Sequence, residues 1–582
     1  MFRPSIPEQG IHAGRLESAW RKEVARLNEA NAIARIWRKD PTLWKSDDAH
    51  AKVIRNRLGW IDVLDTVPGQ LAELRQFAED VRADGFRDIV LLGMGGSSLA
   101  PEVISLLFPP PFQHARFEVV DSTDPASILA VEGGPGATGH GADLRHTLFI
   151  VASKSGKTIE TLTQTKYFLN AVQSALSGPP GGNFVAITDA GSYLDEMATQ
   201  QKFRKIFRNP ADIGGRYSAL SLFGLVPASL WGVDLSAMVD SARAMCDACG
   251  PQAPAGESNP ALALGALMGV AAQAGCDKML VLATESLVPL GNWIEQLVAE
   301  STGKEGKGVL PVAGDLPAPA ESYGPDCFAV VLALEGEERG AIDNLANAFR
   351  QRGTPVAEIA LQRREDLGAE FFRWEAATAV AGATLGIDPF DEPNVQESKD
   401  NTAAILAAPE KTGAMPGGAP VFTEAGIQVF AEGSVRDRIQ MKSISGAVQS
   451  LMSHAGAQSY LAILSFVNRD DSNGSVLDTL RFRLRDSYRR PVLLGYGPRY
   501  LHSVGQFYKG GPPSGVFLVI TCADAQDVAI PGHNYGFGQL KMAQALGDLQ
   551  ALAGRQLPHL RLHLEGGAAL GLRELEKSLG AS

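Results

Sequence analysis

Short runs of aliphatic and β-branched residues alternate with stretches of helical periodicity along most of the chain. Four runs lie in the first half of the chain, at Asp88–Leu92, Phe117–Val120, Thr147–Val151 and Phe184–Ile187. Three more follow, at Lys278–Leu282, Phe328–Leu332 and Val356–Ala360. Strands that alternate with helices are typical of parallel sheets covered on both faces. We therefore predict an α/β fold with two parallel-sheet sandwich domains.

The two ends of the chain differ from this middle part. Residues up to about 75 show helical periodicity from Ala19 to Trp37 and from Asp48 to Leu64. After Pro420, strand-like and helix-like stretches alternate again, with strands at 460–464, 491–494 and 516–520 and helices at 477–488, 540–552 and 575–579. We predict a helical N-terminal arm, two sandwich domains and an additional C-terminal α/β domain, with bounds at 1–75, 76–235, 236–412 and 413–582.

Length, charge and cysteine usage narrow the class of protein. A chain of 582 residues is too long for one core, so about two to four domains are expected. The net charge of −12 and the lack of a long basic run argue against nucleic acid or an anionic membrane as partner. No apolar run reaches membrane-spanning length, the first residues lack a signal-peptide core, and five cysteines do not form a disulfide framework. We expect a cytoplasmic protein.

A hydroxyl-rich turn, Ser153–Thr158, follows the strand Thr147–Val151 and precedes a helix that begins near Ile159. Hydroxyls and free backbone N–H groups at a positive helix end bind anions, most often phosphate. A nucleotide P-loop would need glycine five residues before Gly156, where Val151 stands. A turn that only caps the helix uses the same residue types. This turn alone therefore leaves phosphate binding and simple capping open.

A second turn of this kind, Gly93–Pro101, follows the strand Asp88–Leu92. Its glycines let a ligand approach the backbone, and Ser97 can donate a hydroxyl at the following helix N-terminus. The alternative is a dinucleotide site with Asp121 on the ribose, but Ser98 stands where that motif has its third glycine. Parallel strands end on the same edge of a sheet. We expect Ser97 and the Ser153–Thr158 turn to converge there.

The segments Gly93–Pro101, Ser153–Thr161 and Asp212–Ser218 resemble three N-terminal signatures of the glucose-6-phosphate isomerases, which are built from two sugar-isomerase (SIS) domains. The resemblance continues at Asn292–Lys304 and Ala381–Lys399. It is nearest to the isomerase portion of bifunctional transaldolase/glucose-6-phosphate isomerases, and we expect the transaldolase half to be lacking. It implies SIS-type sandwich domains and reversible isomerisation of glucose 6-phosphate and fructose 6-phosphate in glycolysis and gluconeogenesis, with a small sugar phosphate as partner and no metal or cofactor.

The resemblance also implies a role for each matching residue. Glu300 is the base that moves a proton between C2 and C1, Arg216 stabilises the anionic enediolate, and Lys399 assists ring opening. A carboxylate with a pKa near neutrality and an always-charged guanidinium suit these two tasks. Lys154 is expected to contribute its backbone more than its ammonium. The implied substrate and phosphate contacts are Gly96, Ser97, Ser153, Lys154, Ser155, Thr158, Gly215 and Gln296.

The ring-opening histidine departs from the family order. In the family it follows the base segment closely, within a stretch like Leu-His-Ser-Met-Gly-Gln, but Val312 to Asp326 contain no histidine. A similar sequence occurs at Arg499–Gly510, where His502 takes the position of the family's histidine. We predict that the C-terminal domain supplies this group. His533, in another glycine-rich context, is the main competitor.

Three questions stay open from the sequence. Glu392 stands where family members commonly have glutamine, so its carboxylate must point away from the phosphate, be paired or be protonated. Family members are commonly dimers in which the histidine of one chain enters the site of its partner. A relocated His502 can instead serve the site of its own chain, so both a homodimer and a monomer remain open. The alternative functions are a SIS-domain sugar-phosphate-binding regulator and a nicotinamide-dependent dehydrogenase using the Gly93–Ser98 turn.

Overall fold

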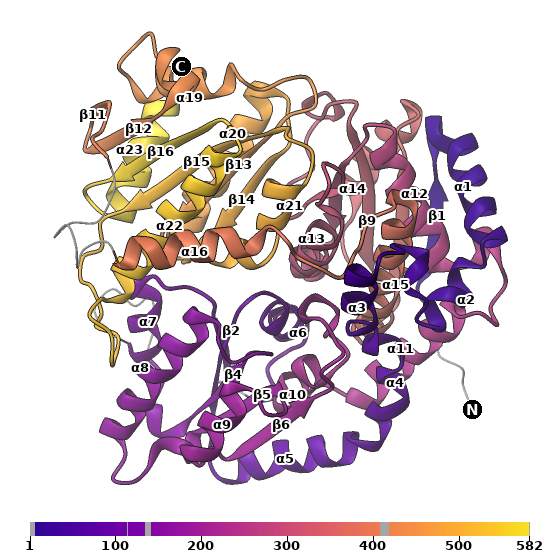
Figure 1. Cartoon of the computed structure of the whole chain (residues 1–582), viewed down its shortest axis with the longest axis horizontal. Coiled ribbons are helices and arrows are strands. Elements are labelled where there is room, and N and C mark those ends of the chain that lie inside the picture. The colour runs from indigo at the N-terminus through magenta and orange to yellow at the C-terminus, as the bar shows by residue number, and fades with distance from the viewer. Residues whose placement is uncertain (1–5, 113–114, 134–140, 408–417, 581–582) are drawn as a thin grey trace.

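Three mixed or parallel sheets with helices packed around them make up the computed structural model of the chain (Figure 1). It describes residues 6–112, 115–133, 141–407 and 418–580. Within these residues no helix is long and apolar enough to cross a membrane. The predicted α/β class is confirmed. The predicted domain bounds stay predictions, and the one at 412/413 lies outside the described residues.

The first sheet is wholly parallel and has the strand order β3-β2-β4-β5-β6. Its strands are β2 (Asp88–Gly93), β3 (Arg116–Val120), β4 (Thr147–Ala152), β5 (Phe184–Asp189) and β6 (Lys205–Asn209). Gly93 lies opposite Ala152 in the register of β2 and β4, so the two polar turns leave the sheet side by side, as predicted. The edge strand β6 was missed because it alternates Lys205, Phe207 and Asn209 with Ile206 and Arg208 and has no continuous apolar run.

The second sheet has the order β1-β10-β9-β7-β8, and only β1 is antiparallel to its neighbour. Its strands are β1 (Glu8–His12), β7 (Lys278–Ala283), β8 (Leu310–Val312), β9 (Cys327–Leu334) and β10 (Val356–Leu361). The prediction of a purely helical arm was therefore incomplete. β1 holds one large apolar residue, Ile11, so its strand state comes from pairing with β10 and not from a local pattern.

The helical part of the arm comprises four short α-helices, α1 (Glu17–Glu29), α2 (Ala32–Trp37), α3 (Asp48–Arg55) and α4 (Val63–Thr66). The predicted helix from Ala19 to Trp37 is interrupted at Asn31, which adopts a left-handed conformation with φ 51°. Trp20, Val24 and Leu27 on α1 are buried in one large core that also contains residues of both five-stranded sheets. The arm thus belongs to the body of the molecule.

The third sheet has the order β11-β12-β16-β15-β13-β14 and belongs to the C-terminal part of the chain. Its strands are β11 (Phe422–Glu424), β12 (Ile427–Ala431), β13 (Tyr460–Phe466), β14 (Val492–Tyr496), β15 (Gly515–Cys522) and β16 (His559–Leu564). The predicted helices at 477–488, 540–552 and 575–579 lie within α20 (Asp471–Tyr488), α22 (Phe537–Gly554) and α23 (Ala568–Gly580). An additional α/β unit is present, as predicted.

The three sheets share cores, so the C-terminal unit is packed against both others (Figure 1). One core combines Leu280 and Phe349 near the second sheet with Tyr460 and Phe517 of the third. Another combines strands of the first sheet with Phe537. The remaining α-helices are α5 (Leu71–Ala83), α6 (Leu99–Leu107), α7 (Pro125–Glu132), α8 (Ile159–Ala175), α9 (Tyr193–Gln200), α10 (Leu222–Leu230), α11 (Leu235–Cys249), α12 (Pro260–Gln273), α13 (Val288–Thr302), α14 (Gly340–Gln351), α15 (Leu367–Leu385), α16 (Val395–Ala407), α18 (Gly433–Asp437), α19 (Ile444–Met452) and α21 (Gly505–Gly510).

Candidate active site

The glycines after β2 bring several distant segments into contact. A Cβ on Gly96 would lie 2.0 Å from the carbonyl oxygen of Gly215 and 2.7 Å from the backbone nitrogen of Arg216. Gly95 has a φ of +53°, and a Cβ there would lie 2.5 Å from the carbonyl oxygen of His502. Only glycine allows this approach. The turn after β2 therefore joins the Arg216 segment on one side to the His502 segment on the other.

The turn after β4 holds its hydroxyls near the N-terminus of α8. Ser153 Oγ accepts a hydrogen bond from the backbone N–H of Gly156 at 3.1 Å and lies 3.3 Å from Thr158 Oγ1. Ser155 Oγ accepts from the N–H of Lys157 at 3.2 Å. Thr158 is the N-cap residue of α8, and its side chain caps no backbone N–H of that helix. Hydroxyls and the helix end are thus available to an anion.

The ammonium of Lys154 is turned away from this turn. It donates to Asp189 Oδ2 at 2.6 Å and to the carbonyl oxygen of Ala211 at 2.7 Å. The geometry agrees with the expectation that Lys154 contributes its backbone more than its charge. Ser97 is partly buried and lies two residues before the start of α6 at Leu99.

Arg216 and Glu300 form a buried pair. The guanidinium Nη1 of Arg216 lies 3.3 Å from Glu300 Oε1. Arg216 also donates from Nε to Ser301 Oγ at 2.8 Å, and from Nη2 to the carbonyl oxygens of Pro389 at 3.0 Å and Asp391 at 2.8 Å. Several bonds from different elements thus fix the guanidinium beside the carboxylate.

The environment shifts the pKa values of both groups. Burial raises the pKa of the Glu300 carboxyl and outweighs the opposing effect of Arg216, while Glu392 adds to the rise. Burial acts to lower the pKa of Arg216, but the two carboxylates outweigh it and the pKa is raised. Arg216 therefore stays charged, and Glu300 is a stronger base than an exposed glutamate.

Glu392 is paired with Arg216. Its Oε2 accepts from Arg216 Nη1 at 3.1 Å. Burial acts to raise the pKa of Glu392, but the charge of Arg216 and this hydrogen bond outweigh it and hold the pKa below its ordinary value. Of the three states that the sequence left open, the structure has the paired one.

Gln296 connects Glu300 to the C-terminal unit. It stands one turn before Glu300 on α13, and its Nε2 donates to Glu300 Oε2 at 3.1 Å and to the carbonyl oxygen of His502 at 2.8 Å. The backbone of His502 is therefore attached to the predicted base through a single side chain.

The imidazole of His502 faces a glutamate that the sequence reasoning missed. His502 Nε2 lies 2.9 Å from Glu160 Oε1, and Gln544 Nε2 donates to the same oxygen at 2.6 Å. Burial acts to raise the pKa of Glu160, but the charge and hydrogen bond of His502 outweigh it and lower the pKa. A glutamate in the first turn of a helix is common because it suits the helix dipole, so its position alone gave no functional signal.

A cavity of about 620 Å³ adjoins His502 and the turn after β4. Ser155, Thr158, Glu160, Lys399 and His502 are among its lining residues. Lys399 is exposed on α16, which leads from the second sandwich to the third sheet (Figure 1). The lining does not include Arg216, Gln296 or Glu300. Of the predicted residues, Ser155, Thr158, Lys399 and His502 thus line the cavity. Arg216 and Glu300 form a buried cluster, which Gln296 links to the backbone of His502.

Two competing interpretations lose support from the geometry. His533 Nε2 lies 3.2 Å from Lys166 Nζ, and burial together with Lys166 lowers the pKa of His533. His533 is not among the residues that line the cavity. Asp121, the proposed ribose ligand of a dinucleotide site, is buried and accepts from Arg499 Nη1 at 2.6 Å. Its carboxylate is therefore engaged by a guanidinium of the C-terminal unit.

Residues 52–309 match the family model of phosphoglucose isomerase. The matched stretch is similar to phosphoglucose isomerases and covers less than half of the chain. The matched stretch contains the two polar turns, Arg216 and Glu300, whereas Lys399 and His502 lie beyond it. His502, the residue that departs from the family order, therefore lies outside the matched stretch.

Similar proteins match this chain over more of its length. A glucose-6-phosphate isomerase of Trichormus variabilis is 26% identical over 430 residues, which cover 66% of this chain and 77% of the relative. One of Rubrobacter xylanophilus is 28% identical over 382 residues, which cover 57% and 86%. The crystal structure of a glucose-6-phosphate isomerase from Chlamydia trachomatis has the same fold over 69% of this chain and 89% of its own, with a TM-score of 0.53 and 18% identity.

Proposed function

We propose that this protein interconverts D-glucose 6-phosphate and D-fructose 6-phosphate through a cis-enediolate, with Glu300 as the base. The observation that carries the proposal is the buried Arg216–Glu300 pair, with 3.3 Å between Nη1 and Oε1, within the stretch that matches the phosphoglucose isomerase family model. One carboxylate suffices for this reaction, because the proton taken from C2 is returned at C1.

The pKa shifts support this division of roles. A base works best when its pKa lies near the working pH, and burial raises that of Glu300 in this direction. The enediolate carries negative charge, which a fixed guanidinium stabilises without supplying a proton. Arg216 meets this requirement because its pKa is raised and its other donors are held by Ser301, Pro389 and Asp391.

The residues that line the cavity suit the two ends of a sugar phosphate, its phosphate group and the sugar ring that must open. Ser155 and Thr158 stand at the N-terminus of α8, where a phosphate dianion meets hydroxyl donors and the positive helix end. His502 and Lys399 line the same cavity and can exchange a proton with the ring oxygen and the C1 hydroxyl. In this arrangement His502 acts in its own chain, and Glu160 orients its imidazole.

The test is solvent isotope exchange combined with turnover. Wild-type protein should convert fructose 6-phosphate and incorporate deuterium from D2O at C2 of the glucose 6-phosphate formed. In Glu300→Gln both rates should fall by about 10³-fold or more, while fructose 6-phosphate binding, measured by calorimetry, is retained. Glu295→Gln, five residues earlier on α13, is the matched control and should keep both rates.

The same experiment separates the competing functions. A sugar-phosphate-binding regulator would bind fructose 6-phosphate without turnover or exchange in the wild type. Near-normal exchange in Glu300→Gln would contradict the assignment of the base. A dehydrogenase would reduce a nicotinamide cofactor, which absorbance reports directly.

A further inference from the structure

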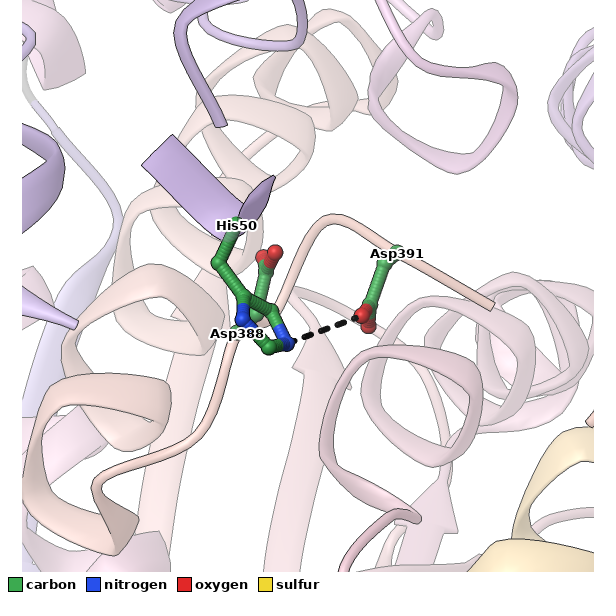
Figure 2. Close-up of side chains that lie close together, drawn as sticks. All are labelled: His50, Asp388 and Asp391. Carbon is green, nitrogen blue, oxygen red and sulfur yellow. Dashed lines mark ion pairs between the residues drawn. The ribbon is translucent and has the colours of Figure 1, made fainter. Parts of the chain in front are cut away.

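Three side chains with metal-binding atoms meet between the N-terminal arm and the segment that follows α15 (Figure 2). His50 comes from α3, and Asp388 and Asp391 come from the loop between α15 and α16. One ligand atom from each lies within 4.8 Å of the others. Atoms that bind one ion at about 2.1 Å lie about 3 to 4 Å apart, so small side-chain rotations would close this cluster onto an ion.

Asp388 has an unpartnered oxygen in this cluster. The residue is fully buried, and its Oδ1 accepts from the backbone N–H of Phe390 at 2.9 Å. Its Oδ2 is buried and has no hydrogen-bond partner among the described residues. Burial, with Asp391 adding to it, raises the pKa of Asp388 to about 6. A buried carboxylate oxygen without a partner is costly, and a cation bound to it would remove that cost.

His50 is held in the orientation of a metal ligand. Its Nδ1 lies 2.8 Å from Asp47 Oδ2, and because a carboxylate oxygen accepts, Nδ1 is the donor, which leaves Nε2 as the nitrogen that a metal ion would bind. Nε2 faces Asp391 Oδ2 at 3.9 Å, as Figure 2 shows, which is too far for a hydrogen bond. A carboxylate behind the distal nitrogen is the usual support of a histidine that binds a metal.

Asp391 has one oxygen left for an ion. Its Oδ1 accepts from Lys304 Nζ at 2.6 Å, and Oδ2 is the oxygen that faces His50. Three carboxylates, of Asp47, Asp388 and Asp391, surround this place. The positive charges that act on them are the ammonium of Lys304 and the guanidinium of Arg216, which is also paired with Glu300 and Glu392. A divalent cation would balance this excess of negative charge.

We propose that His50, Asp388 and Asp391 bind a divalent transition-metal ion, with Zn²⁺ preferred over Mg²⁺. One imidazole nitrogen with two carboxylate oxygens suits zinc, whereas magnesium favours oxygen ligands and retains its waters. A second cluster of possible ligands, formed by Asp124, Cys522 and Asp524, is not proposed as a metal site. There the buried ammonium of Lys541 already lies between the carboxylates, 2.7 Å from Asp124 Oδ2.

The ion would connect the arm to the segment that orients Arg216. The carbonyl oxygens of Pro389 and Asp391 in this segment accept hydrogen bonds from Arg216 Nη2. An ion held by Asp388 and Asp391 on one side and His50 on the other would restrain these carbonyls. Its role is support of the structure, and it takes no part in the proton transfer. The inference does not depend on the proposed function, and it goes beyond the sequence, which predicted no metal.

The test uses the full chain, stripped of metal with a chelator and titrated with ZnCl2 by calorimetry. Wild-type protein should bind one equivalent of Zn²⁺ and melt at a higher temperature with it, while MgCl2 at the same concentration gives little change. His50→Gln should weaken binding by about 10- to 100-fold or abolish it. Co²⁺ should give a visible absorption band in the wild type that is absent from His50→Gln.

His146→Gln is the matched control. His146 Nδ1 lies 3.1 Å from Asp143 Oδ2, also at i,i+3 and on the surface, but His146 does not belong to the cluster. This variant should bind Zn²⁺ like the wild type. Unchanged binding in His50→Gln, equal loss in both variants, or no binding by the wild type would each overturn the proposal. Asp388→Asn should lose binding too. If that variant does not fold, His50→Gln decides, because the His50 side chain is 37% exposed and is not part of the core.

Discussion

His502 Nε2 and Glu160 Oε1 lie 2.9 Å apart although 342 residues separate them in the chain. The glutamate belongs to the first turn of α8, directly after the hydroxyl-rich turn, and the histidine belongs to the C-terminal unit. This contact attaches the C-terminal unit to the edge of the first sheet at which the two polar turns lie. It also assigns a direction to the imidazole, because a carboxylate acceptor on Nε2 orients the ring.

Replacement of Glu160 should therefore impair catalysis through His502. In Glu160→Gln the imidazole loses its charged acceptor, and kcat should fall by about 10- to 100-fold with a smaller change in KM. Glu160→Asp should recover part of the loss. Steady-state kinetics in both directions give the readout. Glu397→Gln on α16, which removes an ion pair with Arg555, is the control and should change neither constant. If kcat fell equally in Glu160→Gln and in the control Glu397→Gln, an orienting role of Glu160 would be contradicted.

His502 should outweigh His533 in catalysis. In His502→Gln the group predicted to open the sugar ring is lost, and kcat for ring-closed substrate should fall by about 100-fold. In His533→Gln, which removes a contact with Lys166, kcat should stay within about twofold of the wild type. A rapid-mixing assay of glucose 6-phosphate turnover measures both. The reverse order of losses would transfer the ring-opening role to His533.

Glu392 should tune the pH dependence of the base. Burial raises the pKa of Glu300, and the negative charge of Glu392 adds to the rise. Glu392→Gln removes that charge, so the pKa of Glu300 should fall. Because the base acts in its deprotonated form, the acid limb of the kcat–pH profile should then move to lower pH. Asp400→Asn, an exposed change on α16, should leave the profile in place. A shift of the acid limb to higher pH would contradict the coupling.

Lys541 should be essential for stability. Its buried ammonium pairs with Asp124 and Asp524 and joins α22 to the start of α7. Lys541→Met leaves two carboxylates without their cation and should cost about 3 to 5 kcal/mol, measured as a lower urea midpoint and melting temperature at pH 7. The triple variant Lys541→Met, Asp124→Asn, Asp524→Asn should recover part of that loss, because it leaves no uncompensated buried charge. No recovery would indicate that packing, and not charge, controls this contact.

The central strands and the two polar turns could be predicted from the sequence because their signals are local. Strands such as Phe149–Val151 within β4 are continuous apolar runs, buried on both faces. The edge strands β1 and β6 and the antiparallel β12 carry mixed residues, so their state depends on the neighbour with which they pair. The site residues divide in the same way. Ser153, Arg216 and Glu300 stand in local stretches of sequence that resemble family motifs, so they could be predicted.

By itself, the sequence determined the α/β class and the position of the two hydroxyl-rich turns, and it predicted residue types suited to proton transfer, because each of these rests on stretches of about ten residues. Only the tertiary structure decided which groups meet. It pairs Glu392 with Arg216, sets His502 against Glu160, and brings His50 beside Asp388 and Asp391. These contacts join segments that are distant in the chain, and burial in shared cores and the close approach at Gly95 and Gly96 create them. No local sequence pattern encodes these contacts, because they stabilise the protein only after the sheets have packed together.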